Sequence, residues 1–173
     1  MLKRFSFILI YLLLLLPGGK SDGLAAASLP TTDSSVLFIA NVGQWDESVR
    51  YQATTRNGVL WLTDEALWLT RLVPDGQINI RLTFPNLNPE TVIEPFDRQE
   101  TVVSYFRGRD PSHWHGAVPV WAGLRLTQVA PGVDLLLTGQ NGQVTPVLVG
   151  DGPVTMQVEG AEEVTVRGRE LHF

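Results

Sequence analysis

The sequence predicts an all-β fold, and within that class an antiparallel β-sandwich built from short strands and hairpins. From Val36 onward, short apolar or alternating runs are separated by glycine, proline, asparagine or aspartate, and no stretch keeps a helical period. Several runs meet at Asp-Gly or Asn-Gly dipeptides, which mark tight hairpins and favour antiparallel sheets over βαβ units. Two stacked sheets bury their apolar faces at this length, so a sandwich is expected first and a closed barrel second.

The clearest strand spans residues 77–84, where apolar side chains at every second position predict one buried and one solvated face. It follows residues 66–73 through the turn Pro74-Asp75-Gly76, which makes the first expected hairpin. Pro146 interrupts a later strand and predicts an edge or a bulge there, because proline cannot donate to a ladder. The other expected hairpins pair 49–55 with 59–63 through Asn57-Gly58, 133–138 with 143–149 through Asn141-Gly142, and 163–166 with 170–173 through Arg167-Gly168.

The first 27 residues have the order of a secretory signal peptide. Basic Lys3 and Arg4 precede the apolar run 5–16, and the small residues 25–27 predict cleavage after Ala27. The run has 12 residues, whereas a bilayer-spanning helix needs about 20, so no stable membrane insertion is expected. Polar residues 28–35 then form a flexible lead-in to one β-sandwich domain over 36–173. The protein is therefore expected to be secreted or held at the cell surface.

The composition excludes several classes of function. Removal of residues 1–27 leaves 10 basic residues, all arginine, and 17 acidic ones, a net charge of −7. An acidic chain without a basic run argues against binding nucleic acid. The chain has no cysteine, which excludes disulfides, thiolate metal sites and thiol nucleophiles. Stability must then come from an ordinary apolar core, for which the 44% hydrophobic residues suffice.

The residues with most potential for chemistry are His113 and His115, with Asp110 just before them. In an extended segment the two imidazoles project from one face and could bind a metal, with the Asp110 carboxylate as a third ligand. A polar loop around the packed Trp114 explains the same residues and is the favoured interpretation. Ser112 lies beside this cluster, but not in the sequence context of a hydrolase nucleophile. We therefore expect no enzyme activity and no cofactor.

Tryptophans provide a second candidate site, because exposed aromatic rings can stack on sugar rings. Trp45, Trp114 and Trp121 lie near expected turns, where a ring is easily exposed, and they are the candidate ligand-binding residues. Trp61 and Trp68 fall on expected hairpin strands and are assigned to the core.

Two longer motifs resemble a known family. Residues 38–46 (FIANVGQWD) are followed by V-R-Y at 49–51, and residues 104–114 (SYFRGRDPSHW) are followed by Val118-Pro119 and P-G-V-D-L at 131–135. Together they resemble the N-terminal domain of large secreted bacterial proteins that continue into SBBP-type β-propeller repeats. The resemblance covers about residues 36–173, with Ser104 where asparagine is usual.

The resemblance implies an extracellular β-sandwich with no assigned reaction or ligand. Its glycines are expected at turns, and its Asn and Asp side chains are expected to cap turn amides. No propeller repeats follow, and the chain stops at Phe173 inside an expected strand, which predicts either a truncated reading frame or a stand-alone module. An open C-terminal edge would favour self-association or a partner strand. The structural motif residues are Asn41, Gly43, Gln44, Gly108, Asp110, Gly132 and Asp134.

These observations favour a non-catalytic, secreted or cell-surface structural or interaction module. The first alternative is a carbohydrate-binding module that uses glycans as partners. The second is a metal-dependent hydrolase centred on His113 and His115.

Overall fold

The computed structural model describes residues 10–15, 36–161, 164–167 and 170–172, and it confirms the all-β, antiparallel prediction. Every strand pairing is antiparallel, and the described residues contain no α-helix, only one turn of 3-10 helix, η1 (Pro111–His113). The predicted cleavage site and the lead-in 28–35 lie outside the described residues. Within the described ranges no helix is long and apolar enough to span a membrane.

In the described part of the chain, thirteen strands make up the sheet. In chain order they are β1 (Ile10–Leu15), β2 (Phe38–Ala40), β3 (Val49–Thr55), β4 (Gly58–Thr63), β5 (Leu67–Val73), β6 (Gly76–Thr83), β7 (Ile93–Tyr105), β8 (His115–Ala130), β9 (Val133–Gln140), β10 (Gln143–Gly150), β11 (Pro153–Glu159), β12 (Thr165–Arg167) and β13 (Glu170–His172).

The long strand β8 holds the fold together, because it pairs with strands from three parts of the chain. One edge pairs with β7. Val120 and Trp121 pair with β2, and residues from Gly123 to Ala130 pair with β9. From β8 one arm of the sheet continues through β2, β3, β4, β5, β6, β11 and β1, and the other through β9, β10, β13 and β12.

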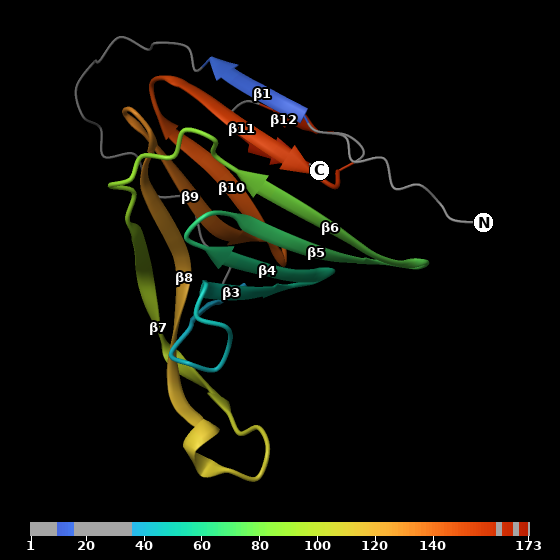
Figure 1. Cartoon of the computed structure of the whole chain (residues 1–173), viewed down its shortest axis with the longest axis vertical. Helices are drawn as coiled ribbons and strands as arrows, with labels where there is room; N and C mark the ends of the chain where they lie inside the picture. Colours follow the sequence, from blue (N-terminus) through green and yellow to red (C-terminus); the bar gives the residue numbers. More distant parts are fainter. Residues whose placement is uncertain (1–9, 16–35, 162–163, 168–169, 173) are drawn as a thin grey trace.

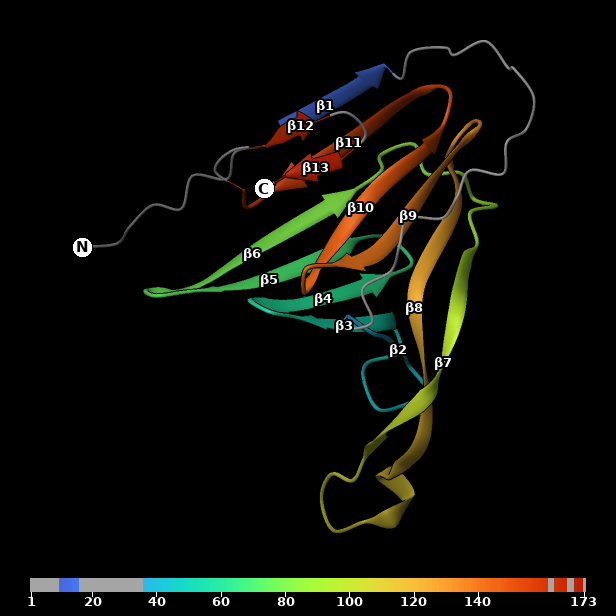
Figure 2. The ribbon, with the colours of Figure 1, turned by 180° about the vertical axis from the view of Figure 1, so that it is seen from behind.

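The two arms belong to one hydrogen-bonded sheet that curls into a half-barrel (Figures 1 and 2). A sandwich of two separate sheets is therefore not confirmed. The physical reason is the length of β8, whose 16 residues are enough to pair with β2 and β9 one after the other.

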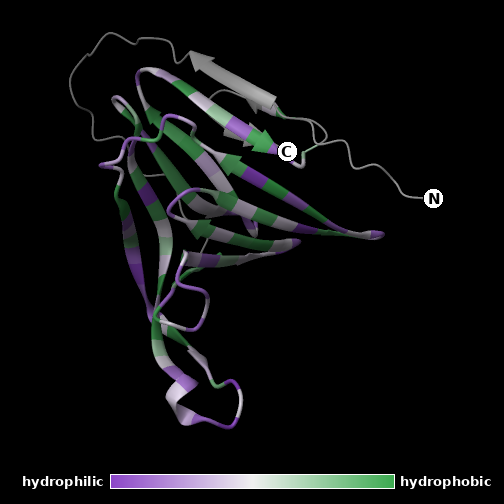
Figure 3. Cartoon of the chain, viewed as in Figure 1, coloured by the Kyte–Doolittle hydropathy of each residue, from purple (hydrophilic) through white to green (hydrophobic). Residues whose placement is uncertain are grey.

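The main core lies between the arms. Its fully buried side chains come from both arms and from β8, and they include Phe38, Leu62, Leu124, Leu137 and Met156. Apolar and polar segments alternate along the strands of the body in Figure 3, as expected for strands with one buried face. In β6, Ile80 and Leu82 are buried while Asn79 is exposed, which confirms the predicted alternation.

All four predicted strand pairs form, but the first two turns are displaced by one residue. In the fourth hairpin Arg167 pairs with Glu170, so it belongs to β12 and not to the turn, and Gly168 lies outside the described residues. Thr55 pairs with Gly58, so the β3–β4 turn is Arg56-Asn57 and Gly58 begins β4. A Cβ on Gly58 would lie 1.8 Å from the carbonyl oxygen of Thr70, so close strand packing requires glycine there. The β5–β6 turn is likewise Pro74-Asp75, because Val73 pairs with Gly76. Asn141 and Gly142 both have positive φ and form the β9–β10 turn as predicted.

The N-terminal apolar run contributes strand β1 to the edge of the sheet. Its six residues pair with β11 from Ile10 opposite Val158 to Leu15 opposite Pro153. The segment predicted to be the apolar part of a signal peptide therefore covers the outer edge of β11 in this structure.

Strands β7 and β8 extend beyond the body as a projecting hairpin, which we call the tongue (residues 102–118; Figure 1). Val102 pairs with Pro119 and Tyr105 with His115, with a register shift between the two pairs. The tip carries η1 and lies at the far end of the molecule from β1 and β11 (Figures 1 and 2).

Candidate functional site

The loop of residues 41–48 folds onto the outer face of the sheet and is held by the side chain of Asn41. Its amide nitrogen donates to the carbonyl oxygens of Asp46 and Val49, both at 2.8 Å. Its amide oxygen accepts hydrogen bonds from the backbone of Gly43 at 3.0 Å and Trp45 at 3.3 Å. One side chain thus connects both ends of the loop to its middle, and fixes the position of Trp45.

Gln44 and Gly43 complete this loop. The Gln44 side chain donates to the Ala40 carbonyl at 2.6 Å and accepts from the Val42 amide at 2.7 Å. Gly43 has a φ of 109°, and a Cβ there would lie 3.0 Å from Cε1 of the His115 ring. His115 therefore packs against the loop and links it to the tongue.

Trp45 forms the centre of an aromatic cluster on the outer face. Its ring meets Trp61 edge-to-face at 5.3 Å between centroids and Tyr105 at 5.4 Å. A small apolar cluster that includes Ile39 and Val120 packs beside it. Trp45 is half-buried there, between the tongue and strand β4.

A transverse row of side chains crosses the same outer face. Five residues that are register partners on neighbouring strands share this face. They are Gln52 on β3, Trp61 on β4, Trp68 on β5, Arg81 on β6 and Glu159 on β11. Trp68 is 42% exposed, and the Arg81 guanidinium lies 5.2 Å from its ring centroid. Arg81 Nη1 is 3.6 Å from Glu159 Oε1.

The assignment of Trp68 to the core is therefore wrong, and Trp61 is only half-buried. Leu67 is buried and Leu69 packs against the core, so the residue between them must face outward. That alternation was present in the sequence and could have placed Trp68 on the solvent side.

Two depressions meet at the turn after β4. One lies on the outer face beside Trp68, and the other opens toward the main core, where Tyr51, Ile93 and Leu126 line it. One depression of about 280 Å³ is lined by Ser48, Thr63, Asp64, Glu65, Ala66, Trp68 and Arg81. A second, of about 580 Å³, lies between the ends of β3 and β4 and the segment before β7. Both depressions are lined by Thr63 and Asp64, so they adjoin each other, and we refer to them together as the Trp68 groove.

An exposed ion pair lies where the two depressions meet. Arg50 donates to Asp64 through Nε at 2.8 Å and Nη2 at 2.6 Å, so the guanidinium binds both carboxylate oxygens. The hydrogen bond from Arg50 lowers the pKa of Asp64, and the hydrogen bond to Asp64 raises the pKa of Arg50. Sequence reasoning missed this pair, because the two residues are brought together only by the pairing of β3 with β4.

The tongue tip exposes a second aromatic pair. Phe106 is 66% exposed and Trp114 is 43% exposed, and their rings meet edge-to-face at 5.6 Å. Asp110 caps η1 by accepting from the Ser112 amide at 2.9 Å, and this hydrogen bond lowers the pKa of its carboxyl. Gly108 has a φ of 73°, which favours glycine in the turn before the cap.

The residues of the metal hypothesis lie at or near the tongue tip. His113 is exposed in η1, and His115 packs against the loop of Gly43. No group of three or more His, Asp or Glu side chains that could hold a metal ion occurs within the described part of the chain. The side chain of His172 lies outside that part. The metal site stays an untested prediction.

Trp121, Gly132 and Asp134 lie on or beside β8. Trp121 is half-buried against the main core, with the Arg98 guanidinium 5.9 Å from its ring. Gly132 has a φ of 72° in the β8–β9 turn. Asp134 accepts from the Gln128 amide at 2.7 Å and also binds the Arg125 guanidinium, which supports the irregular end of β8. The structure thus separates the three candidate tryptophans: Trp45 lies in the aromatic cluster, Trp114 at the tongue tip, and Trp121 against the main core.

Comparison with known proteins identifies a family for this fold and site. No curated protein and no solved structure matches the chain. Residues 38–173 match a family described as a domain of unknown function, DUF7948. That description contains no link to propeller-repeat proteins or to secretion. The match covers both sequence motifs, the aromatic cluster, the groove and the tongue, and the chain belongs to the DUF7948 family.

Proposed function

We propose that the protein is an exported, non-catalytic interaction module that docks onto a protein surface through the tip of its tongue. The observation that carries this proposal is the exposed Phe106–Trp114 pair at the end of a hairpin that projects from the body. Export is supported by the residue order of the first 27 positions.

The tip has the properties of a binding hot spot. Buried aromatic residues each remove roughly 150–250 Å² of surface from water, and Trp, Tyr and Arg are the residues enriched at hot spots. The Asp110 cap and the edge-to-face ring contact favour this conformation of the tip in the free protein. Pre-organisation lowers the entropic cost of binding, so a small contact can still be specific.

The charge of the tip indicates the kind of surface it would meet. Arg107 and Arg109 flank Gly108, and the only acidic residue between positions 106 and 114 is Asp110, whose carboxylate caps η1. The chain as a whole carries a net charge of −5. A basic, aromatic tip on an acidic protein suits an apolar pocket rimmed by carboxylates.

A photo-crosslinker tests this proposal in the cells that make the protein. Phe106→p-benzoylphenylalanine should yield one discrete crosslinked product, and the added charge reversals Arg107→Glu and Arg109→Glu should reduce its amount at least about fivefold. The matched control is Leu72→p-benzoylphenylalanine, because Leu72 is 64% exposed on the β5–β6 hairpin. Equal products from both positions, or none from position 106, would refute docking through the tip.

A further inference from the structure

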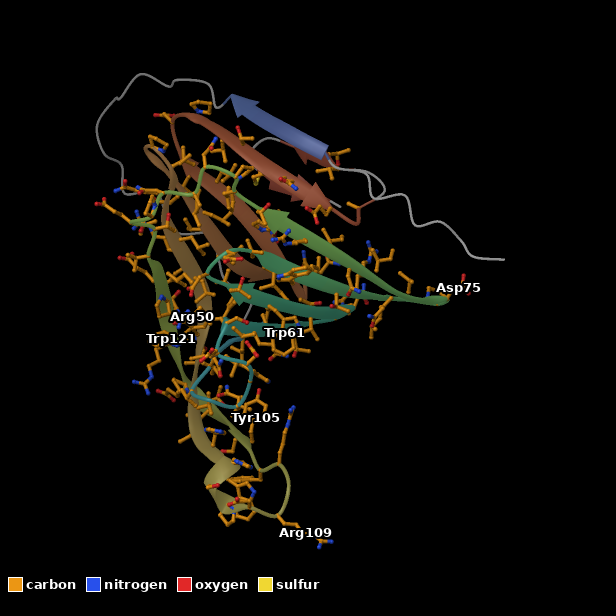
Figure 4. The ribbon with its side chains drawn as sticks, viewed as in Figure 1. Arg50, Trp61, Asp75, Tyr105, Arg109 and Trp121 are labelled. Atoms are coloured by element: carbon orange, nitrogen blue, oxygen red, sulfur yellow. The ribbon has the colours of Figure 1, made fainter. Side chains whose placement is uncertain are left out.

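We propose that the Trp68 groove is a binding site for a neutral carbohydrate chain. This site is separate from the tongue tip and does not depend on it. Figure 4 shows Arg50 and Trp61 on the body of the sheet and Arg109 at the far end of the tongue.

The aromatic platform of the site is Trp68. Trp68 is 42% exposed on the outer face and lines a depression of about 280 Å³. The C–H face of a sugar ring packs on such a surface by dispersion and by attraction to the negative π-face. The pairing of β5 with both β4 and β6 fixes the backbone of Trp68, so the platform is formed before the ligand binds.

Arg81 has hydrogen-bonding capacity to spare beside this platform. Its Nε is buried and has no acceptor among the described residues, so a ligand would reach only the terminal nitrogens, of which Nη1 lies 3.6 Å from Glu159. The guanidinium is therefore held mainly by the Trp68 ring, at 5.2 Å from its centroid. A sugar hydroxyl in the groove would offer its terminal N–H groups a better acceptor than they have in the free protein.

The Arg50–Asp64 pair supplies the polar partners for a second sugar ring. Both side chains are more than half exposed, and both are held in place by their two mutual hydrogen bonds. The carboxylate can accept a hydrogen bond from one sugar hydroxyl, and the guanidinium can donate a hydrogen bond to the next. A sugar ring presents such pairs of neighbouring hydroxyl groups. Because the pKa of Asp64 is lowered, its carboxylate stays an acceptor at neutral and mildly acidic pH.

The shape and charge of the groove define the ligand further. The two depressions share Thr63 and Asp64, so a chain of sugar rings that passes this turn would contact both. Volumes of about 280 and 580 Å³ are of the size that small-ligand sites have, roughly 300–1,000 Å³. Two acidic side chains, Asp64 and Glu65, and two arginines, Arg50 and Arg81, line the groove, so its charges balance and favour neutral chains over sulfated or uronic-acid polymers.

The experiment measures binding of the purified full-length chain to soluble neutral glucan, mannan, galactan and xylan, with a sulfated glycan and a polyuronate beside them. We expect at least one neutral polymer to bind. Trp68→Ala should weaken that binding at least about tenfold, and Asp64→Asn should weaken it at least about threefold. Trp114→Ala, which removes an equally exposed ring from the tongue tip, should leave binding unchanged.

Circular dichroism and urea unfolding verify that each variant is folded, and Asp64→Asn provides a test should Trp68→Ala fail to fold. Binding to none of the neutral polymers, binding to the anionic polymers alone, or neutral binding that both variants retain would each overturn the proposal. The tongue variants test the docking proposal separately, so the failure of one proposal is distinguishable from the failure of the other.

Discussion

Trp68 and Arg81 are register partners on β5 and β6, and the Arg81 guanidinium lies 5.2 Å from the centroid of the Trp68 ring. This cation–π contact helps to hold the exposed Trp68 ring in place on the surface. Glu159 lies on the next strand and reaches Arg81 only at 3.6 Å. The aromatic contact should thus matter more for Arg81 than its ion pair does.

Replacing Arg81 and Glu159 in turn compares the contribution of the aromatic contact to stability with that of the ion pair. Arg81→Ala should lower the free energy of unfolding by about 1 kcal/mol, because an exposed cation–π contact contributes about 0.5–1 kcal/mol and an exposed ion pair about 0–1 kcal/mol. Glu159→Gln should cost less than about 0.5 kcal/mol. Urea unfolding followed by tryptophan fluorescence gives both values, with the exposed Arg71→Ala on β5 as the control. Equal losses for Arg81→Ala and Glu159→Gln would show that the ion pair is the dominant contact.

The elements that the sequence predicts well are those with local causes. The β9–β10 hairpin follows from Asn141 and Gly142, which both adopt positive φ, and the buried face of β6 follows from its alternation. The single curled sheet could not be predicted, because it depends on which segment of β8 pairs with β2 and which with β9. No local pattern in the sequence specifies those partners.

The candidate site was predicted less well than the fold. Proximity to turns selected Trp45, Trp114 and Trp121 as exposed tryptophans, but Trp121 packs against the core, and the exposed Trp68 was assigned to the core. The Arg50–Asp64 pair spans 14 residues and needs the strand register to be found. Sites built from register partners on several strands are visible only once the pairing is known.

Gly123 on β8 gives a prediction about packing. The ring of Phe96 on β7 covers this glycine, and a Cβ there would lie 2.1 Å from Cζ of that ring. Gly123→Ala should therefore cost about 1–3 kcal/mol through overpacking. In a Phe96→Ala background the same change should cost at least about 1 kcal/mol less, because the clash is gone.

Gly116→Ala is the control for these variants. No atom of the described residues, apart from the two chain neighbours, lies within 4 Å of the added Cβ, so the change should alter stability by less than about 0.5 kcal/mol. Denaturant unfolding of the two single variants and the double variant gives the coupling energy. Additive effects of Gly123→Ala and Phe96→Ala would contradict direct packing of the ring on the glycine.

The Arg50–Asp64 pair gives a prediction about pH. The hydrogen bond from Arg50 lowers the pKa of Asp64 in the folded chain below its usual 3.8. The resulting stabilisation is present above pH 3.8 and is lost as the pH falls through the lowered folded-state pKa. Its size should be under about 1 kcal/mol, because both side chains are exposed.

Asp64→Asn should therefore reduce stability at pH 7 and have almost no effect at pH 2. Unfolding curves of both proteins between pH 2 and pH 7 check this, with Asp75→Asn at the β5–β6 turn as the matched exposed control. A stability difference between wild type and Asp64→Asn that stays constant down to pH 2 would be inconsistent with this ion pair.

The pairing of β1 with β11 gives a prediction about assembly. Residues 10–15 cover the outer edge of β11, and export with cleavage after Ala27 would remove them. An uncovered edge strand presents unpaired N–H and C=O groups that pair readily with another strand. The chain 28–173 should therefore dimerise in a concentration-dependent way in sedimentation equilibrium. Thr155→Lys, which places a charge on β11, should weaken this dimer at least about fivefold. Pairing at β11 would be contradicted if the chain 28–173 stayed monomeric at about 0.1 mM. It would also be contradicted if Thr155→Lys left the dimer unchanged, and the dimer contact would then be sought at the C-terminal strands β12 and β13.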